Sequence, residues 1–384
     1  MSVVLPCLDE AASVGLCVLE ARDALDRIGG GDVIVVDNGS TDGSADVARA
    51  AGAIVIHEPR PGYGRAIRTG VDAAPPSVVV VADADMTYDL SRLGELVSPV
   101  LAGEADLVIG ARRGGTDRRA MPLTHRLVGT PVLSYLIRNA TGGQVLVDDS
   151  QSGFRAMPRD TFVGLDLNAT GMEFASEMLI RAARQDLRIT ELPLGYRKRI
   201  GTSKLSARAD AWRHVREIAS LAPAMFLIGP GVMLAGLGLT VAIWSVVAGD
   251  AVTVGSWRWE PVFFATIALV IGAQAALVGV LLEARSPGPT VRSRRWRSFV
   301  YSPNFGRWCG RSGAVLAVTG ALVDIALVPL RAHTGIGDER ALALAGLAQS
   351  MLIVGCTAAG FGALWHRVAE IGIAPEGRRA NASG

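Results

Sequence analysis

One stretch decides the fold of the N-terminal half: Val78-Val79-Val80-Val81-Ala82-Asp83-Ala84-Asp85. A run of β-branched apolar residues is typical of a strand that is buried on both faces of a parallel sheet. Residues two positions apart point the same way, so Asp83 and Asp85 can converge at the carboxyl end of the strand, where open α/β sheets bind ligands. Adjacent carboxylates repel unless a cation lies between them. The pair is therefore a candidate site for Mg²⁺ or Mn²⁺ shared with a diphosphate, and an Asp-rich turn without a metal is the alternative.

Strands and helices alternate on both sides of this stretch. The apolar patterns predict strands at 2–7, 32–36, 53–57, 78–83 and 106–111, with helices between them that include 11–27, 65–74 and 90–101. Such alternation predicts a doubly wound parallel sheet. A dinucleotide site would need Gly-x-Gly-x-x-Gly after the first strand, but Pro6-Cys7-Leu8-Asp9-Glu10 stands there, so that class of site is disfavoured.

Acidic residues follow three of the predicted strands instead. They are Asp9 with Glu10, Asp37, and Asp83 with Asp85. Carboxylates accept hydrogen bonds from base N–H groups and ribose hydroxyls, or they hold a metal that in turn holds phosphate. This arrangement favours a nucleoside diphosphate that binds together with a metal.

The C-terminal half is much more apolar. Half of the 384 residues are hydrophobic, and the mean hydropathy of +0.34 is high for a soluble protein. The excess gathers in four spans at about 222–248, 261–282, 313–330 and 341–364, each close to the roughly 20 residues that cross hydrocarbon. Asp324 in the third span is expected to pair within a helix interface, with Gln274 or Gln349.

The segment at 207–221 joins the two halves. It combines arginines with apolar residues at three-residue spacing, which are Trp212, Val215, Ile218 and Leu221. Aromatic and basic residues on one helix predict that it lies in a membrane interface, and an ordinary surface helix is the alternative.

Loop charges predict the orientation in the membrane. Arginines gather between 285 and 311 and in the tail, whereas the loops at 249–260 and 331–340 carry few cations. By the positive-inside rule, residues 1–221, the loop at 284–312 and the C-terminus are expected in the cytoplasm. No signal peptide is expected, the four scattered cysteines are expected to be free thiols, and no nucleic-acid partner is expected.

Short motifs carry a resemblance to a known family. Pro6–Glu10, Val36–Gly43, Gly62–Ala66 and Asp83–Asp85 resemble, in this order, the family 2 inverting glycosyltransferases of GT-A fold. Gly110–Arg112, Asp149–Arg155, Met172–Met178 and Gly201–Leu205 look like the polyprenyl-phosphate (dolichyl-phosphate) glycosyltransferases. The resemblance covers residues 1–210. The chain is therefore expected to contain a Rossmann-like GT-A domain at 1–206, an interfacial helix at 207–221, an α-helical transmembrane domain at 222–366 and a cytoplasmic tail at 367–384.

The resemblance also implies roles for single residues. The donor base and ribose would contact Pro6, Glu10 and Asp37, with Gly64 and Arg65 on the loop beside them. The metal and the diphosphate would bind Asp83 and Asp85, and the candidate catalytic residues are Asp85 and Asp149, with Asp149 near the sugar. The lipid phosphate would face Arg112, Arg126 and Arg155, helped by Lys204 and by Lys198 or Arg199. Met86 stands where relatives often carry a polar residue.

The chemistry of these residue types points the same way. A lipid phosphate is already an anion at neutral pH, so positioning and charge neutralisation matter more than a strong general base. Arginine matches phosphate oxygens, and the stretch at 196–204 supplies cations, although a solvated basic loop is the alternative. The prediction is a metal-dependent, inverting transfer of one sugar from a UDP- or GDP-sugar to a polyprenyl phosphate at the cytoplasmic membrane face.

Two other functions stay open. A processive polysaccharide synthase would need a Gln-x-x-Arg-Trp signature, but Arg295-Trp296 and Arg307-Trp308 lack the glutamine. A membrane scaffold with an inactive transferase-like domain is opposed by the Asp83/Asp85 pair. Small residues in the spans, such as Gly231 and Ala235, permit close helix contacts and leave room for a homo-oligomer.

Overall fold

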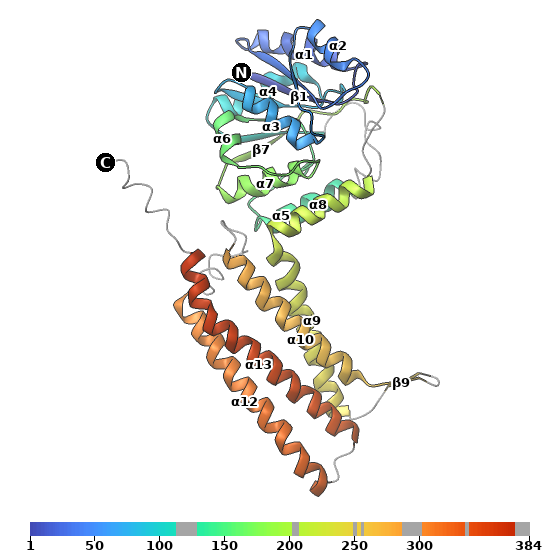
Figure 1. Ribbon diagram of the computed structural model, residues 1–384, viewed down its shortest axis with the longest axis vertical. Coiled ribbons are helices and arrows are strands. Elements are labelled where there is room, and N and C mark those ends of the chain that lie inside the picture. The colour runs from blue at the N-terminus through green and yellow to red at the C-terminus, as the bar shows by residue number, and fades with distance from the viewer. Residues whose placement is uncertain are drawn as a thin grey trace, which may run out of the picture. The chain divides into compact units, whose positions relative to one another are not determined.

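The computed structural model describes residues 1–112, 129–201, 207–248, 252–254, 257–285, 302–334 and 338–372. It divides into two compact units, Met1–Leu221 and Ala222–Gly384 (Figure 1). The first unit contains an α/β sheet, and the second contains long helices.

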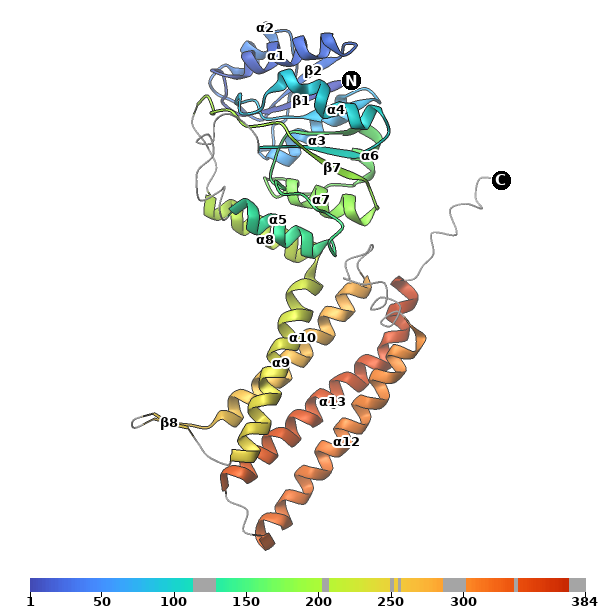
Figure 2. The ribbon, with the colours of Figure 1, turned by 180° about the vertical axis from the view of Figure 1, so that it is seen from behind.

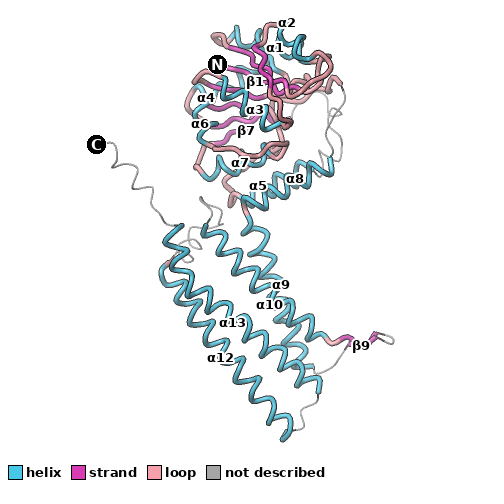
Figure 3. Tube along the Cα trace, viewed as in Figure 1, coloured by secondary structure: helices cyan, strands magenta, loops and turns pink. Residues whose placement is uncertain are grey.

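A seven-stranded sheet forms the centre of the first unit (Figure 3). Its strands are β1 (Ser2–Cys7), β2 (Asp32–Asp37), β3 (Ile54–His57), β4 (Val78–Val81), β5 (Leu107–Ala111), β6 (Arg155–Pro158) and β7 (Ile189–Pro193), in the order β3-β2-β1-β4-β6-β5-β7. The expectation of an all-parallel sheet is wrong at one strand, because β6 runs antiparallel to both β4 and β5. Its four residues, Arg-Ala-Met-Pro, contain no apolar run that could have predicted a central strand.

Helices cover both faces of the sheet (Figure 1). The helices of this unit are α1 (Val14–Arg27), α2 (Ser44–Ala50), α3 (Tyr63–Ala73), the short η1 (Leu90–Arg92), α4 (Leu93–Leu101), α5 (Thr130–Ala140), α6 (Arg159–Gly164), α7 (Phe174–Arg184) and α8 (Ala207–Leu221). Val3 and Leu5 of β1 share one core with α1 and α4, whereas Val4 between them points to the opposite face, which α3 covers. Burial on both faces explains why these strands read as continuous apolar runs.

Helix α8 packs against α5 and α7, and Figure 2 shows it beside α5. Its buried face consists of Asp210, His214 and Ile218, and His214 Nδ1 lies 2.9 Å from the hydroxyl of Ser176 on α7. Trp212, one member of the three-residue apolar repeat, is 67 % exposed and lies off this buried face. At 3.6 residues per turn, a three-residue repeat drifts around the helix, whereas positions four apart stay on one face.

The second unit contains α9 (Pro223–Ala248), α10 (Pro261–Arg285), α12 (Pro303–Thr334) and α13 (Asp338–Gly372), with a hairpin of β8 (Val252–Val254) and β9 (Trp257–Trp259). Within the described part of the chain, four helical segments are long and apolar enough to cross a membrane: Pro223–Ala248, Pro261–Glu283, Asn304–Pro329 and Glu339–Trp365. The predicted boundary of the third span is wrong, because α12 begins at Pro303. The helix therefore includes Arg307 and Arg311, which the sequence pattern assigned to a loop.

Small residues let these helices approach closely in pairs, α9 with α10 and α12 with α13. A Cβ atom at Gly272 of α10 would lie 2.3 Å from the backbone nitrogen of Ala235 on α9. In apolar surroundings, helices gain no hydrophobic driving force for association. Close backbone contact of this kind stabilises their pairing through van der Waals packing instead.

Gly272→Val is therefore expected to disrupt the pairing of α9 and α10, because the new side chain would overlap backbone that has no room to shift. The transition temperature of the full chain in detergent should fall by several degrees. Gly236→Val on α9 is the matched control, since a Cβ there meets no atom within 4 Å. Equal shifts for both variants would contradict the packing role of Gly272.

Burial of His214 should make the stability of the folded chain depend on pH. Burial lowers the pKa of His214 to about 4 from its ordinary 6.5. Between these pH values the unfolded chain binds a proton at this residue and the folded chain does not, so stability falls as the pH drops through this window, by about 3 kcal/mol at most. In denaturant unfolding, the free energy of unfolding of His214→Asn should fall less between pH 6.5 and 4 than that of wild type. If the difference between the two proteins stays constant over this range, the prediction is wrong. Asp83 titrates in both proteins, so the difference isolates His214.

Candidate active site

A cleft of about 510 Å³ opens at the carboxyl ends of β1 and β4. The end of β1 and the loop after it contribute Pro6, Cys7, Leu8 and Glu10, and the residues after β4 contribute Asp83 to Asp85. Other walls come from Asn38, the loop at 61–63, the segment at 170–173, Arg199 and two residues of α8. Its volume lies within the range of roughly 300–1,000 Å³ that small-molecule sites occupy.

The structure places Asp83 and Asp85 together in this cleft. The hydroxyl of Tyr63 donates to Asp83 Oδ1 at 2.9 Å, and the backbone nitrogen and hydroxyl of Thr87 donate to Asp85 Oδ1 at 3.0 and 2.5 Å. Burial, and then the neighbouring charge of Asp85, raise the pKa of Asp83 to about 6. The two neighbouring carboxylates therefore favour a cation that would reduce their mutual repulsion.

The two carboxylates fit a divalent cation that is shared with a ligand. Among the residues that the structure describes, no group of three or more His, Cys, Asp or Glu side chains is placed to hold a metal. A cation at Asp83 and Asp85 would thus need oxygens from elsewhere. Mg²⁺ and Mn²⁺ commonly complete their coordination with water and substrate phosphate, so the donor set suits them.

Arg199 forms a bridge between two acids of the cleft. Its Nη1 lies 3.2 Å from Asp85 Oδ2, and its Nη2 contacts Glu10 Oε1. Backbone hydrogen bonds from Arg197 to Thr87 and from Ile200 to Asp85 hold the basic stretch in this position. A cation that binds Asp85 Oδ2 would compete with Arg199 for the same oxygen. The neighbouring Lys198 is exposed.

The end of β2 contributes Asn38 rather than Asp37. Asp37 is 7 % exposed and accepts from the Ser40 nitrogen at 3.0 Å, with His57 Nδ1 3.1 Å away. Burial opposes its ionisation, but the hydrogen bonds from Ser40 and His57 lower the pKa of Asp37. Asn38 lines the cleft and accepts from the Gly62 nitrogen at 2.7 Å, so it holds the loop that leads into α3.

Gly64 and Arg65 lie in the first turn of α3, and neither is among the described residues that line the cleft. The Gly64 nitrogen donates to the carbonyl of Thr170 at 2.9 Å, and a Cβ at Gly64 would lie 2.5 Å from the carbonyl oxygen of Ala169. Gly64 therefore permits the segment at 169–173 to approach α3. Its place beside the nucleotide stays a prediction.

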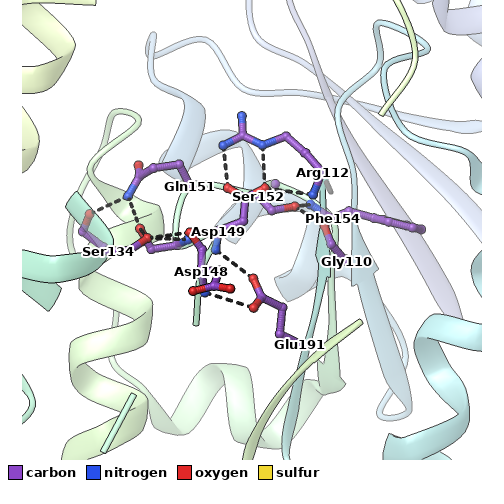
Figure 4. A network of polar contacts seen from close by, with 12 residues as sticks. Gly110, Arg112, Ser134, Asp148, Asp149, Gln151, Ser152, Phe154 and Glu191 are labelled. Atoms are coloured by element: carbon purple, nitrogen blue, oxygen red, sulfur yellow. Dashed lines mark hydrogen bonds and ion pairs between the residues drawn. The ribbon is translucent and has the colours of Figure 1, made fainter. Parts of the chain in front are cut away.

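Arg112 and Asp149 form a buried ion pair (Figure 4). Arg112 Nε and Nη2 donate to the two Asp149 oxygens at 2.8 and 2.6 Å, and the Arg112 backbone nitrogen donates to Oδ2 at 2.9 Å. The backbone nitrogen of Asp149 donates to Glu191 at 2.7 Å. Burial opposes the charge, but Arg112 lowers the pKa of Asp149. Asp149 thus orients Arg112. The place of Asp149 at the sugar and of Arg112 at the lipid phosphate stays a prediction.

Arg155, which was predicted to face the lipid phosphate, lies in the interior of the domain. Its side chain is 3 % exposed, and its three nitrogens donate to the carbonyls of Ser152, Ala175 and Ser150 at 2.7–3.0 Å. A guanidinium that is surrounded by carbonyl groups organises the interior and does not reach a phosphate. Arg126 and Lys204 lie outside the described residues.

Comparison with known proteins agrees with this geometry. Residues 2–160 match the model of glycosyl transferase family 2. An uncharacterized glycosyltransferase of Mycobacterium tuberculosis is 40 % identical over 207 residues, which cover 54 % of this chain and 89 % of that protein. This chain belongs to glycosyltransferase family 2. The family 2 transferase has a GT-A-like mixed sheet, followed by four apolar helices.

Other relatives of this family 2 transferase carry more specific names. The dolichyl-phosphate hexose transferase of Haloferax volcanii is 32 % identical over 210 residues, covering 53 % of this chain and 86 % of that protein. The low-salt glycan biosynthesis hexosyltransferase Agl6 of the same organism is 36 % identical and covers 64 % of this chain, which spans 60 % of Agl6. Among solved structures, glucosyl-3-phosphoglycerate synthase of Mycobacterium tuberculosis, in complex with Mn²⁺, UDP and phosphoglyceric acid, is 26 % identical with a TM-score of 0.46, covering 57 % of this chain and 77 % of that chain.

Sequence reasoning assigned no role to several residues of this cleft. They are Asn38, Tyr63, Glu173, Asp210 and Arg213. Thr87, which donates to Asp85, was also given no role. The spacing along α8 could have indicated Asp210. It precedes His214 by four residues and Ile218 by eight, so all three lie on the face that α8 buries. The other side chains converge only through contacts that are distant in the chain.

The buried Arg112–Asp149 pair generates a stability prediction. Asp149→Asn should lower the free energy of unfolding by about 3–5 kcal/mol, because it leaves a buried guanidinium without its counter-charge. Asp106→Asn is the matched control, since Arg188 and Asp106 form a similar ion pair with side chains 56 % and 29 % exposed. That variant should cost about 0–1 kcal/mol. Denaturant unfolding measures both, and equal losses would contradict the structural role of the Arg112–Asp149 pair.

Proposed function

We propose that this family 2 transferase moves one hexose from a nucleoside-diphosphate sugar to a polyprenyl phosphate, with inversion at the anomeric carbon and with a divalent metal. The observation that carries the proposal is the pair Asp83 and Asp85, which shares a cleft with Arg199 in a chain that also contains four apolar helices. The relative named dolichyl-phosphate hexose transferase supports the choice of a lipid phosphate as acceptor.

Different residues of the cleft can bind different parts of the donor and its metal. Pro6, Glu10 and Asn38 line the part of the wall formed by the ends of β1 and β2, where they can contact the nucleoside. Asp83 and Asp85 would hold the metal, which supplies positive charge to the departing diphosphate. The acceptor phosphate attacks as an anion, so the chain has to position it and does not have to remove a proton. The attack forms the new bond on the face opposite the leaving diphosphate, and this inverts the sugar.

Cations that would hold the acceptor phosphate come from the basic stretch. Lys198, Arg199 and Lys204 are the candidates there, and Arg126 is a fourth. Arginine suits the task because its planar fork matches two phosphate oxygens. Since Arg199 already contacts Glu10 and Asp85, it can neutralise charge on either reactant.

The membrane arrangement is part of the proposal. We place residues 1–206 and the C-terminal tail in the cytoplasm, with a multi-pass domain at 222–366, because arginines are concentrated at 285–311. The exposed face of α8 carries Trp212, Arg213 and Arg216, which suits an interfacial helix. This arrangement puts the cleft in the compartment where nucleotide sugars are available.

A direct assay tests the proposed transfer. Membranes that contain the protein are incubated with polyprenyl phosphate, Mg²⁺ or Mn²⁺, and labelled UDP- or GDP-hexoses, and the lipid extract is examined. A labelled glycolipid should form with one donor and disappear with a chelator. If no donor yields a metal-dependent glycolipid, the proposed function is wrong.

Asp85→Asn separates an enzyme from an inactive scaffold. It should reduce transfer by at least about 10³-fold, because the metal loses a charged ligand at the position where the leaving group gains charge, while far-UV circular dichroism stays unchanged. Asp46→Asn is the matched control, since Asp46 is an exposed acid paired with Arg49. Full transfer by Asp85→Asn would favour the scaffold function.

A further inference from the structure

Helix α8 contributes one wall of the donor cleft as well as an exposed surface. Asp210 and Arg213 of this helix line the cleft together with Thr170, Gly171, Met172 and Glu173, which precede α7. The hydrogen bond between His214 and Ser176 and the burial of Ile218 fix α8 against α7. The carboxylates of Asp210 and Glu173 therefore have a defined place in the cleft.

Among the described residues, each of these two carboxylates has one oxygen with a hydrogen-bond donor and one oxygen without. Asp210 Oδ1 accepts from Arg213, and Glu173 Oε1 accepts from the Gly171 nitrogen at 2.8 Å. Asp210 Oδ2 and Glu173 Oε2 are buried, and neither has a hydrogen-bond partner among the residues that the structure describes. Asp210 as a whole is only 9 % exposed. A buried acceptor without a partner costs about 1–3 kcal/mol, so a ligand that donates to it gains that stabilisation.

The surrounding charges narrow the class of ligand. Arg213 pairs with Asp210, and the charge of Glu173 acts on the same guanidinium, so one cation already offsets part of the negative charge. A bound metal would need more acids than this, and no group of three is available among the described residues. A phosphate would be repelled by the two carboxylates. A neutral ligand with several hydroxyl donors fits the two oxygens that have no partner in the described part of the chain.

The position of Asp210 and Glu173 in the cleft indicates which neutral ligand would bind there. A hexose that is attached to a diphosphate held at Asp83 and Asp85 lies in the same cleft, and the segment at 170–173 and α8 supply walls within it. We propose that Asp210 and Glu173 accept hydrogen bonds from hydroxyl groups of the transferred hexose and so determine which sugar is used. This inference rests on the proposed function, because it takes a nucleoside-diphosphate hexose as the donor.

Such a site would discriminate strongly between a hexose and the analogue that lacks one of its hydroxyl groups. A pocket that hydrogen-bonds a hydroxyl through buried acceptors rejects the analogue that lacks it, because the acceptors then remain without partners. Asp210→Asn should therefore weaken binding of the nucleotide hexose by about 10- to 100-fold and leave binding of the free nucleoside diphosphate unchanged.

The experiment measures binding without turnover. The full chain in detergent, with Mn²⁺, is titrated with UDP-glucose, UDP-galactose, GDP-mannose, UDP and GDP, and the tightest donor is then compared with its monodeoxy analogues. Wild type should bind at least one deoxy analogue more weakly than the parent sugar, and Asp210→Asn should lose that difference. Glu173→Gln should lose it for a second hydroxyl. Glu217→Gln is the matched control, because Glu217 is on α8 but does not line the cleft.

Each outcome has a clear meaning. An Asp210→Asn protein that binds the donor and all its deoxy analogues as wild type does would overturn the inference, as would an equal loss for the free nucleoside diphosphate. If Asp210→Asn fails to fold, as judged by its thermal transition, Glu173→Gln decides by the same comparison. Because no acceptor is present, a wild type that binds donor but forms no glycolipid rejects only the proposed acceptor.

Discussion

Repulsion between two carboxylates at the end of one buried strand is the constraint on which the site depends. Folding of β4 into the sheet brings Asp83 and Asp85 into one cleft, and burial raises the pKa of Asp83. Tyr63 and Thr87 donate to the pair, and Arg199 adds a positive charge. These contacts lower the cost of the charge without removing it. The remaining negative charge suits a divalent cation and, through it, a diphosphate.

The arginines show how similar side chains acquire different roles. Arg155 is surrounded by three carbonyl groups, and Arg112 is paired with Asp149, so both are used in holding the domain together. Arg199 instead contacts two acids that line the cleft. A guanidinium has five donors, and its role depends on which acceptors the fold places around it. The type of residue indicated an affinity for phosphate, but the location of the acceptors decides whether phosphate can be reached.

Helix α8 has two faces with different partners. Trp212 and Arg216 are exposed, whereas Asp210, His214 and Ile218 face the domain. One segment of 15 residues can thus form an outer surface and also supply part of the cleft wall. The long apolar helices pack in a more uniform way, because glycines such as Gly272 let neighbouring backbones meet closely.

The linear pattern was sufficient for features that repeat locally. Apolar runs predicted β1, β2 and β4, long apolar segments predicted the four long apolar helices, and acids after strands predicted the edge of the sheet at which the cleft opens. These predictions succeed because burial and the period of each element act on neighbouring residues. The antiparallel β6, the pairing of Arg112 with Asp149 and the entry of Asp210 into the cleft appeared only in the tertiary structure. Each depends on contacts between residues far apart in the chain, and no local periodicity records which of them will meet.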